Sequence, residues 1–230
     1  MRFLVILLLL VLSACSASPP HRAVSSTLVS SLGNSTVALL RPSRSTIGEY
    51  VPFCSGVFIS NKTILTAYHC VSDTIGTITI GTLEDAEVTE GLFYGQHHRE
   101  YAVLRSEVDQ DLALLTYADN RPMPEHSAVS LSDTLPVVGE SIVVCGHPGG
   151  LLWSFSHGMV SQVEFRVGWA GSLDILLFQH QAPTWGGNSG GPIVNLDGAL
   201  IGIVHGGVHN AESIGVGIHL DSIKNFISHR

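Results

Sequence analysis

Short runs of β-forming residues, separated by turn residues, recur along most of this chain and restrict its fold more than any other feature. They fall into two sets on either side of a connector, 119–124, that is rich in turn formers. Two such sets favour an all-β fold of two antiparallel six-stranded barrels, the first at about 35–120 and the second at about 128–220. The predicted strands are 36–40, 53–59, 63–66, 77–80, 101–105 and 112–117 in the first set, and 141–145, 152–155, 159–163, 175–179, 193–195, 200–204 and 215–218 in the second.

The end of the chain has a different pattern. Ile223, Phe226 and Ile227 stand at i, i+3 and i+4, and Asp221 can cap the turn in front of them. This spacing predicts a short amphipathic helix at about 221–229.

The first residues predict export from the cytoplasm. A short positive start precedes the apolar run 3–12, which is too short to cross a bilayer and fits the core of a secretory signal. The residues LSAC at 12–15 match a lipobox, in which the thiol of Cys15 receives a lipid; cleavage after Ala14 or Ala17 is the alternative. We expect a signal at 1–15, a flexible tether at 16–34 and an extracytoplasmic protein, secreted or anchored to the membrane by lipid.

The segment GGNSGGP at 186–192 has the composition of a backbone that turns sharply, exposes one hydroxyl and aims its own N–H groups at one point. A Gly-rich run alone is compatible with an ordinary loop. Here, however, TAYHC at 66–70 lies upstream and DLALL at 111–115 lies between the two. Together these three segments indicate a nucleophilic triad of His69, Asp111 and Ser189. Because its histidine and aspartate fall in the first set and its serine in the second, we expect the site in the cleft between the barrels.

Several segments also resemble those of a known family. The chain is similar to the trypsin-like (chymotrypsin-fold) serine proteases, and especially to the bacterial high-temperature-requirement proteases and the glutamyl endopeptidases, at 55–70, 109–115, 138–150, 156–161 and 214–218. The similarity covers about 35–228, and the three triad frames together are strongly specific. The resemblance implies a serine endopeptidase that hydrolyses polypeptides through an acyl-enzyme intermediate.

The resemblance also implies a role for each matching residue. Ser189 is the nucleophile and His69 takes its proton. Asp111 fixes the tautomer of that imidazole, and it is preferred to Asp109 because it directly precedes the apolar run, as the family pattern requires. The backbone N–H groups of Gly187 and Ser189 form the oxyanion hole.

The cysteines fit the same resemblance. Cys54 and Cys70 match a disulfide that braces the catalytic histidine, which leaves Cys145 as a buried strand thiol if Cys15 carries lipid; a Cys15–Cys145 bridge is the alternative. One residue departs from the zymogen proteases, since Asn188 stands where they carry an aspartate that pairs with a newly freed N-terminus. An amide cannot form that ion pair, so no N-terminal cleavage switch is expected.

The resemblance places the walls of the S1 pocket at 181–185 and 203–207. Neither segment contains an acidic residue, so a preference for Arg or Lys at P1 is not expected. Thr184 with its neighbour Trp185, and His205 on the opposite wall, are the predicted substrate-binding residues. Thr184 and His205 are the two that could receive a P1 carboxylate. The histidine of the glutamyl endopeptidases falls nearer Val204 in an ungapped comparison, so a small or aliphatic P1 residue is the alternative.

Composition argues against several other classes. The formal net charge is −8 and no basic stripe appears, which argues against a nucleic-acid partner. The twelve histidines lack the tight spacing of metal ligands, so neither a metal nor another cofactor is expected. The alternatives to a peptidase are a narrow-specificity esterase on the same triad and a catalytically silent binding protein on the same fold.

Overall fold

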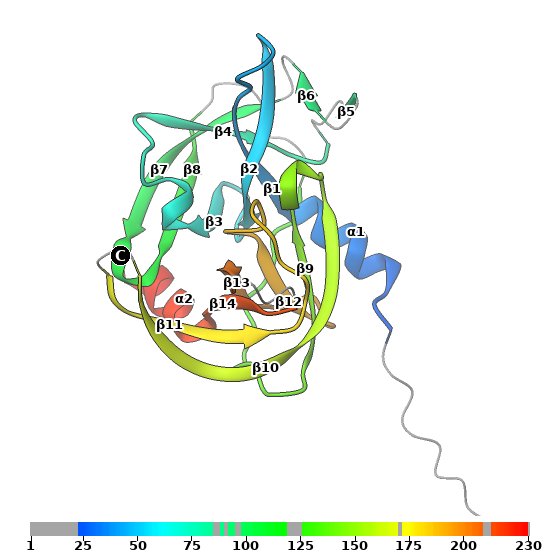
Figure 1. Cartoon of the computed structure of the whole chain (residues 1–230), viewed down its shortest axis with the longest axis vertical. Coiled ribbons are helices and arrows are strands. Elements are labelled where there is room, and N and C mark those ends of the chain that lie inside the picture. The colour runs from blue at the N-terminus through cyan, green and yellow to red at the C-terminus, as the bar shows by residue number, and fades with distance from the viewer. Residues whose placement is uncertain are drawn as a thin grey trace, which may run out of the picture.

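The computed structural model of the chain describes residues 23–84, 88–89, 92–94, 98–118, 126–169, 172–208 and 213–229. Two antiparallel β-barrels make up most of it, with one helix before the first barrel and one after the second (Figure 1). The predicted signal, the lipobox with Cys15 and the connector 119–124 lie outside the described residues. Within the described ranges, no helix combines the length and apolar character that a membrane crossing requires.

The first barrel is closed by six strands. The strands follow one another in the order β1-β4-β7-β8-β3-β2, and pairing of β1 with β2 completes the ring. Large apolar side chains such as Phe58, Ile80 and Tyr101 are fully buried inside it. The strands are β1 (Thr36–Pro42), β2 (Glu49–Phe58), β3 (Thr63–Ala67), β4 (Thr77–Gly81), β7 (Arg99–Glu107) and β8 (Leu112–Tyr117), with β6 (Leu92–Tyr94) and β5 (Val88–Thr89) added at the edge of β2.

The second barrel is also closed by six strands, in the order β10-β11-β14-β13-β12-β9. Its strands are β9 (Ser141–Gly146), β10 (Ser154–Trp169), β11 (Ser172–His180), β12 (Pro192–Asn195), β13 (Leu200–Gly207) and β14 (Gly215–His219). The predicted fold class, two six-stranded antiparallel barrels and a short C-terminal helix, is therefore confirmed.

One strand of the second barrel differs from its prediction. The sequence predicted separate strands at 152–155 and 159–163, whereas β10 runs without a break through Gly158. A Cβ atom at Gly158 would collide with the backbone of Ala182. The glycine therefore marks a close approach of two backbones within the barrel, and the predicted break between the strands at 156–158 was wrong.

The helix α1 (Ser26–Ser35) occupies the end of the segment that was predicted as a flexible tether, so that prediction is wrong for residues 26–34. Ser25 caps the helix, because its hydroxyl oxygen accepts a hydrogen bond from the N–H of Leu28 at 3.1 Å. The serine-rich composition hid the helix, since serine favours caps and turns over helix interiors.

Tertiary packing stabilises α1. Leu28 and Leu32 lie one turn apart and are buried in the same apolar cluster as residues of the second barrel. The indole N–H of Trp153, just before β10, donates to the carbonyl oxygen of Gly33 at 3.1 Å. The helix is thereby fixed to the second barrel before the chain enters the first.

The second helix, α2 (Leu220–Ser228), follows β14 directly. Its N-cap is His219, whose Nδ1 accepts the N–H of Asp221 at 3.2 Å, so the predicted cap at Asp221 is wrong by two residues. Phe226 is buried, and the guanidinium of Arg105 from β7 lies 4.6 Å from the centre of its ring and donates to its carbonyl oxygen at 2.8 Å. The helix that leaves the second barrel therefore docks on a strand of the first.

Candidate active site

Two short 3₁₀ turns bring His69 and Asp111 together. His69 lies in η1 (Tyr68–Cys70), which follows β3, and Asp111 ends η2 (Val108–Gln110), which precedes β8. Because β3 and β8 are paired, the two turns meet at the same end of the strands, and the N–H of Tyr68 donates to the carbonyl oxygen of Asp111 at 3.0 Å. Asp111 adopts the left-handed conformation at φ 52° and ψ 40°, which aspartate tolerates better than most residues.

The Asp111 carboxylate holds His69 at two points. The backbone N–H of His69 donates to Oδ1 at 2.9 Å, and its ring Nδ1 lies 2.9 Å from Oδ2. A second imidazole reaches the same oxygen, since Nδ1 of His205 lies 2.7 Å from Oδ2. Burial alone would raise the pKa of this carboxyl, but the hydrogen bonds from His205 and His69 outweigh that effect and lower it to about 2. An ionised carboxylate only accepts hydrogen bonds, so both Nδ1 atoms carry protons and donate.

Ser189 lies on the loop between β11 and β12, which is pressed against the first barrel. Its carbonyl oxygen accepts the N–H of Ser55 in β2 at 2.8 Å. The next residue, Gly190, has φ +81°, and a Cβ there would collide with the carbonyl oxygen of Ser55 and the hydroxyl of Thr66. Glycine is required at this position because the two barrels meet backbone to backbone.

The hydroxyl of Ser189 donates to the carbonyl oxygen of His205 at 3.3 Å. The ring of His205 in turn bonds to Asp111 and stands edge-on to the ring of His69, with 5.8 Å between ring centres. The structure thus joins His69 to Asp111 directly and connects Ser189 to both through His205. The catalytic roles assigned to His69, Asp111 and Ser189 remain predictions that this arrangement supports.

Contacts with Ser55 and His147 hold the loop that carries the predicted oxyanion donors. Gly187 has φ +107°, and a Cβ there would collide with the carbonyl oxygen of His147. The carbonyl oxygen of Gly187 accepts the hydroxyl of Ser55 at 2.8 Å, and that hydroxyl oxygen lies 2.9 Å from Nδ1 of His147. In the described part of the chain, no protein group accepts the N–H of Gly187 or of Ser189. Both donors are thus available for a developing oxyanion, and their role in an oxyanion hole stays a prediction.

Sequence reasoning missed Ser55 and His147 as parts of this site. They lie 132 and 40 positions from Gly187, and no local motif connects them. His147 is fully buried, which lowers its pKa to about 3, so the ring is neutral. Because the hydroxyl of Ser55 donates to Gly187, it must accept from Nδ1–H of His147, and the neutral ring thereby fixes the direction of the Ser55 hydroxyl.

The cysteine predictions can be compared with the structure where the chain is described. Cys54 and Cys70 form the expected disulfide, which connects β2 to the turn that carries His69. The sulfur of Cys70 lies 3.6 Å from the carbonyl oxygen of Ser189, so the disulfide contacts the serine loop as well. Cys145 in β9 is a buried free thiol, and burial raises its pKa to about 12.

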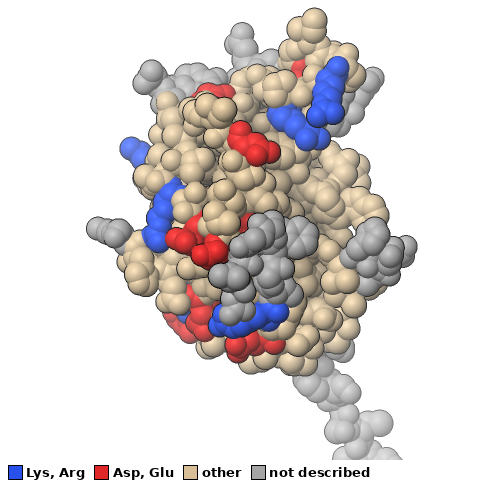
Figure 2. All heavy atoms as spheres, turned by 60° about the vertical axis from the view of Figure 1, so that its left-hand side comes forward, with Lys and Arg blue, Asp and Glu red and all other residues tan. Residues whose placement is uncertain are grey.

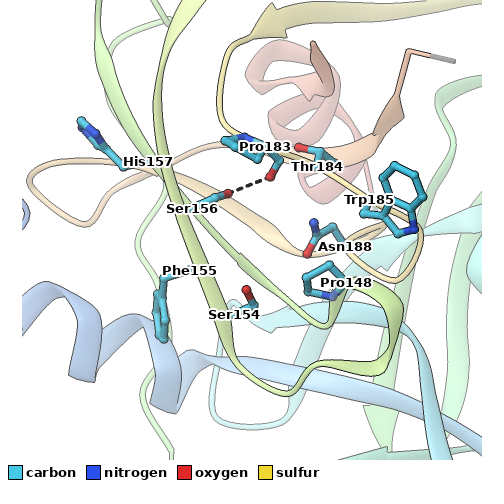
Figure 3. A pocket seen from close by; sticks show the side chains of 9 residues that line it. All are labelled: Pro148, Ser154, Phe155, Ser156, His157, Pro183, Thr184, Trp185 and Asn188. Atoms are coloured by element: carbon cyan, nitrogen blue, oxygen red, sulfur yellow. Dashed lines mark hydrogen bonds between the residues drawn. The ribbon is translucent and has the colours of Figure 1, made fainter. Parts of the chain in front are cut away.

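A pocket of about 570 Å³ opens beside the serine loop (Figure 3). The loop that carries Pro183, Thr184 and Trp185 faces the β10 segment with Ser154 and Ser156, and the hydroxyl of Ser156 donates to the carbonyl oxygen of Pro183 at 2.9 Å. The residues that line this pocket include the predicted substrate-binding pair Thr184 and Trp185. They do not include the third predicted residue, His205, whose ring Nδ1 is bonded to Asp111.

Two groups of described residues place metal-ligand atoms within 4.8 Å of one another. In the first, the sulfurs of Cys54 and Cys70 beside His69 belong to the disulfide and are not free to bind an ion. In the second, His69 and His205 already donate to Asp111 at 2.9 and 2.7 Å, and these hydrogen bonds account for the cluster. The expectation that no metal is needed stays a prediction.

Two closed six-stranded barrels, with a histidine–aspartate pair from the first facing a glycine-rich serine loop of the second, define the class of chymotrypsin-fold serine proteases. The comparisons with known proteins identify the family within that class. The trypsin-like peptidase domain matches residues 54–203, so this chain belongs to the trypsin-like peptidase family, a family of serine endopeptidases.

Individual relatives agree with this assignment. The chain is 31% identical over 176 residues to the mitochondrial protease Do-like 4 of Arabidopsis thaliana, covering 76% of this chain and 31% of that protein. It is 28% identical over 187 residues to the glutamyl endopeptidase of Staphylococcus epidermidis, covering 75% of this chain and 60% of that one. This chain thus spans less than two thirds of the length of either relative.

Solved structures support the fold. The Rv3671c protease of M. tuberculosis in its inactive form superimposes with a TM-score of 0.69 at 20% identity, covering 91% of this chain and 95% of that one. The match to the trypsin-like peptidase domain and the similarity to the two relatives confirm the predicted resemblance to trypsin-like serine proteases.

Proposed function

We propose that this chain is a serine endopeptidase that cleaves polypeptides outside the cytoplasm, with His69, Asp111 and Ser189 as its catalytic residues. The observation that carries the proposal is the doubly bonded His69–Asp111 pair beside a serine loop that is fixed to the same barrel by Ser55 and Gly190. Membership of the trypsin-like peptidase family supports the reaction class.

The geometry suggests how the reaction begins. Asp111 holds the proton of His69 on Nδ1, which leaves Nε2 unprotonated and able to act as a base. The hydroxyl of Ser189 must rotate away from the carbonyl oxygen of His205 toward that nitrogen. Its oxygen then attacks the carbonyl carbon of the substrate while its proton passes to Nε2.

The later steps use the same groups. The substrate oxygen takes up the negative charge and is stabilised by the N–H groups of Gly187 and Ser189. His69 returns its proton to the departing amine, which leaves an ester on Ser189. Water then attacks this ester with His69 again as the base, and the new carboxyl product leaves with the serine hydroxyl restored.

A fluorophosphonate probe tests the proposal. It should label the purified chain at Ser189, and neither Ser189→Ala nor His69→Ala should be labelled at a comparable rate. Ser228→Ala is a matched control, because this exposed serine on α2 only bonds to the backbone of its own helix, and it should be labelled like the wild type. No labelling of a folded wild-type chain, or equal labelling of Ser189→Ala, would contradict the proposal.

The substrate class can be narrowed by kinetics. A narrow esterase would hydrolyse ester substrates and leave matched peptides intact, whereas an endopeptidase cleaves both. For P1 the two predictions are an acidic residue, held near Thr184, and a small or aliphatic one. One relative is named a glutamyl endopeptidase, which favours testing the acidic residue first. Cleavage of a peptide library only after Arg or Lys would contradict both predictions.

The charge distribution and the disulfide support the proposed setting. On the face in Figure 2, basic and acidic side chains are interspersed on a largely uncharged surface, which suits a polypeptide partner better than a nucleic acid. The Cys54–Cys70 disulfide is typical of an oxidising compartment. Mass spectrometry of the mature N-terminus would distinguish a lipid on Cys15 from cleavage after Ala14 or Ala17.

A further inference from the structure

A single residue, His205, contacts all three predicted catalytic residues, each with a different part of itself. Its ring Nδ1 donates to Oδ2 of Asp111 at 2.7 Å, and its ring stands edge-on to that of His69. Its backbone carbonyl accepts the hydroxyl of Ser189 at 3.3 Å. His205 is 8% exposed, so these contacts occur inside the protein.

A β-bulge turns His205 toward this position. Along β13 and β14, Val204 pairs with Gly217 and Gly206 pairs with Val216, so the register shifts at His205, the extra residue of the bulge. A bulge redirects the side chain of its extra residue relative to a regular strand. The register therefore explains why His205 bonds to Asp111 and is absent from the lining of the pocket that holds Thr184 and Trp185.

The contact has a consequence for Asp111. The carboxylate can rotate about its side-chain bonds, so each donor that holds one of its oxygens restricts its plane further. His69 donates to both carboxylate oxygens, and His205 donates to Oδ2 from a different strand and the other barrel. Donors from two barrels fix the carboxylate, and with it the orientation of the His69 ring.

We propose that His205 is a positioning residue of the catalytic site, which holds Asp111 from the second barrel and thereby keeps His69 oriented toward Ser189. This inference rests on the proposed function. It assigns to His205 a role in turnover in place of the predicted contact with the P1 side chain, and the two roles differ in what they change. A positioning residue alters kcat, whereas a residue of the S1 wall alters KM and the P1 preference.

The test compares His205→Ala with His205→Asn, because the amide nitrogen of Asn can take the place of Nδ1 and donate to Asp111. On a peptide substrate, His205→Ala should lower kcat about tenfold or more, with KM changed less than about twofold. His205→Asn should recover most of the loss. His219→Ala, which removes another buried histidine of the same barrel, should keep the wild-type kcat even if it lowers the melting temperature.

Three results would overturn the proposal: a wild-type kcat in His205→Ala, a loss in His205→Asn as large as in His205→Ala, or a changed P1 preference at unchanged kcat. If the folded wild type is inert to substrate and to fluorophosphonate, the proposed function fails first. In that case NMR of the ¹⁵N-histidine protein decides separately. A hydrogen-bonded Nδ1–H signal that disappears in His205→Ala supports the contact with Asp111, and absence of this signal refutes it.

Discussion

Acidification from pH 7 to pH 5 should destabilise the fold through its buried neutral histidines. His147 is fully buried, and burial lowers its pKa from 6.5 to about 3. Burial likewise lowers the pKa of His180 to about 4. A group whose pKa is lower in the folded state binds more protons when unfolded, so its contribution to stability is present above the unfolded pKa and is lost as the pH falls.

The size of the effect follows from the unfolded chain. A pH of 5 is about 1.5 units below the pKa of an imidazole in the unfolded chain. Proton binding therefore stabilises the unfolded state by about 2 kcal/mol for each histidine that stays neutral in the fold. Two such histidines lower the free energy of unfolding by about 4 kcal/mol, which is a large share of the stability of a typical domain. Asp111 adds nothing in this window, because its pKa moves from 3.8 to about 2 and its contribution is lost only below about pH 4.

The assay is denaturant unfolding at pH 7 and pH 5 in a Ser189→Ala background, which prevents self-cleavage. His147→Asn keeps a partner for the hydroxyl of Ser55 but cannot titrate, so its loss of stability between the two pH values should be about 2 kcal/mol smaller than that of the parent. His157→Asn is the matched control, since this histidine is exposed on β10 and the substitution should leave the pH difference unchanged. An equal loss in His147→Asn and the parent would refute the reasoning.

Three further predictions concern the serine loop and the cysteines. Gly187→Ala should slow fluorophosphonate labelling about a hundredfold, because a Cβ there collides with the carbonyl oxygen of His147 and displaces the oxyanion donors; a wild-type labelling rate would contradict this. Joint replacement of Cys54 and Cys70 by Ser should lower the free energy of unfolding by about 3 kcal/mol, measured in urea, since the disulfide closes a loop of 16 residues. Iodoacetamide should leave Cys145 unmodified in the native protein and alkylate it after denaturation, because its pKa is raised to about 12; rapid native alkylation would show that the thiol is accessible.

Much of the fold could be predicted from the sequence, because most strands have local signals. Alternating β-forming residues between turn formers located nearly all strands of both barrels to within a few residues. The helix α1 has no comparable signal, since its stability depends on burial of Leu28 and Leu32 against strands far away in the chain. The continuity of β10 through Gly158 was missed for the same reason, because the close neighbour of this glycine, Ala182, is distant in sequence.

In the candidate site, too, the residues with local motifs could be predicted and those that depend on distant contacts could not. Motifs of a few residues located His69, Asp111 and Ser189, and the structure brings the three together around His205. The orientation of His205 could not be predicted, because a shift in strand register between β13 and β14 decides which way the side chain points. The support of Gly187 by Ser55 was also hidden, since it depends on how the two barrels meet.

The docking of α2 has a mechanical consequence. The helix begins where the last strand of the second barrel ends. Its residue Phe226 contacts Arg105 of the first barrel with its ring and accepts a hydrogen bond from Arg105 with its carbonyl oxygen. The parts of the proposed catalytic site that lie on different barrels are therefore held together by α2, which resists any hinge motion that would move the ring of His69 away from Ser189. Under the proposed function, removal of α2 should slow turnover, although it alters no residue of the proposed catalytic site.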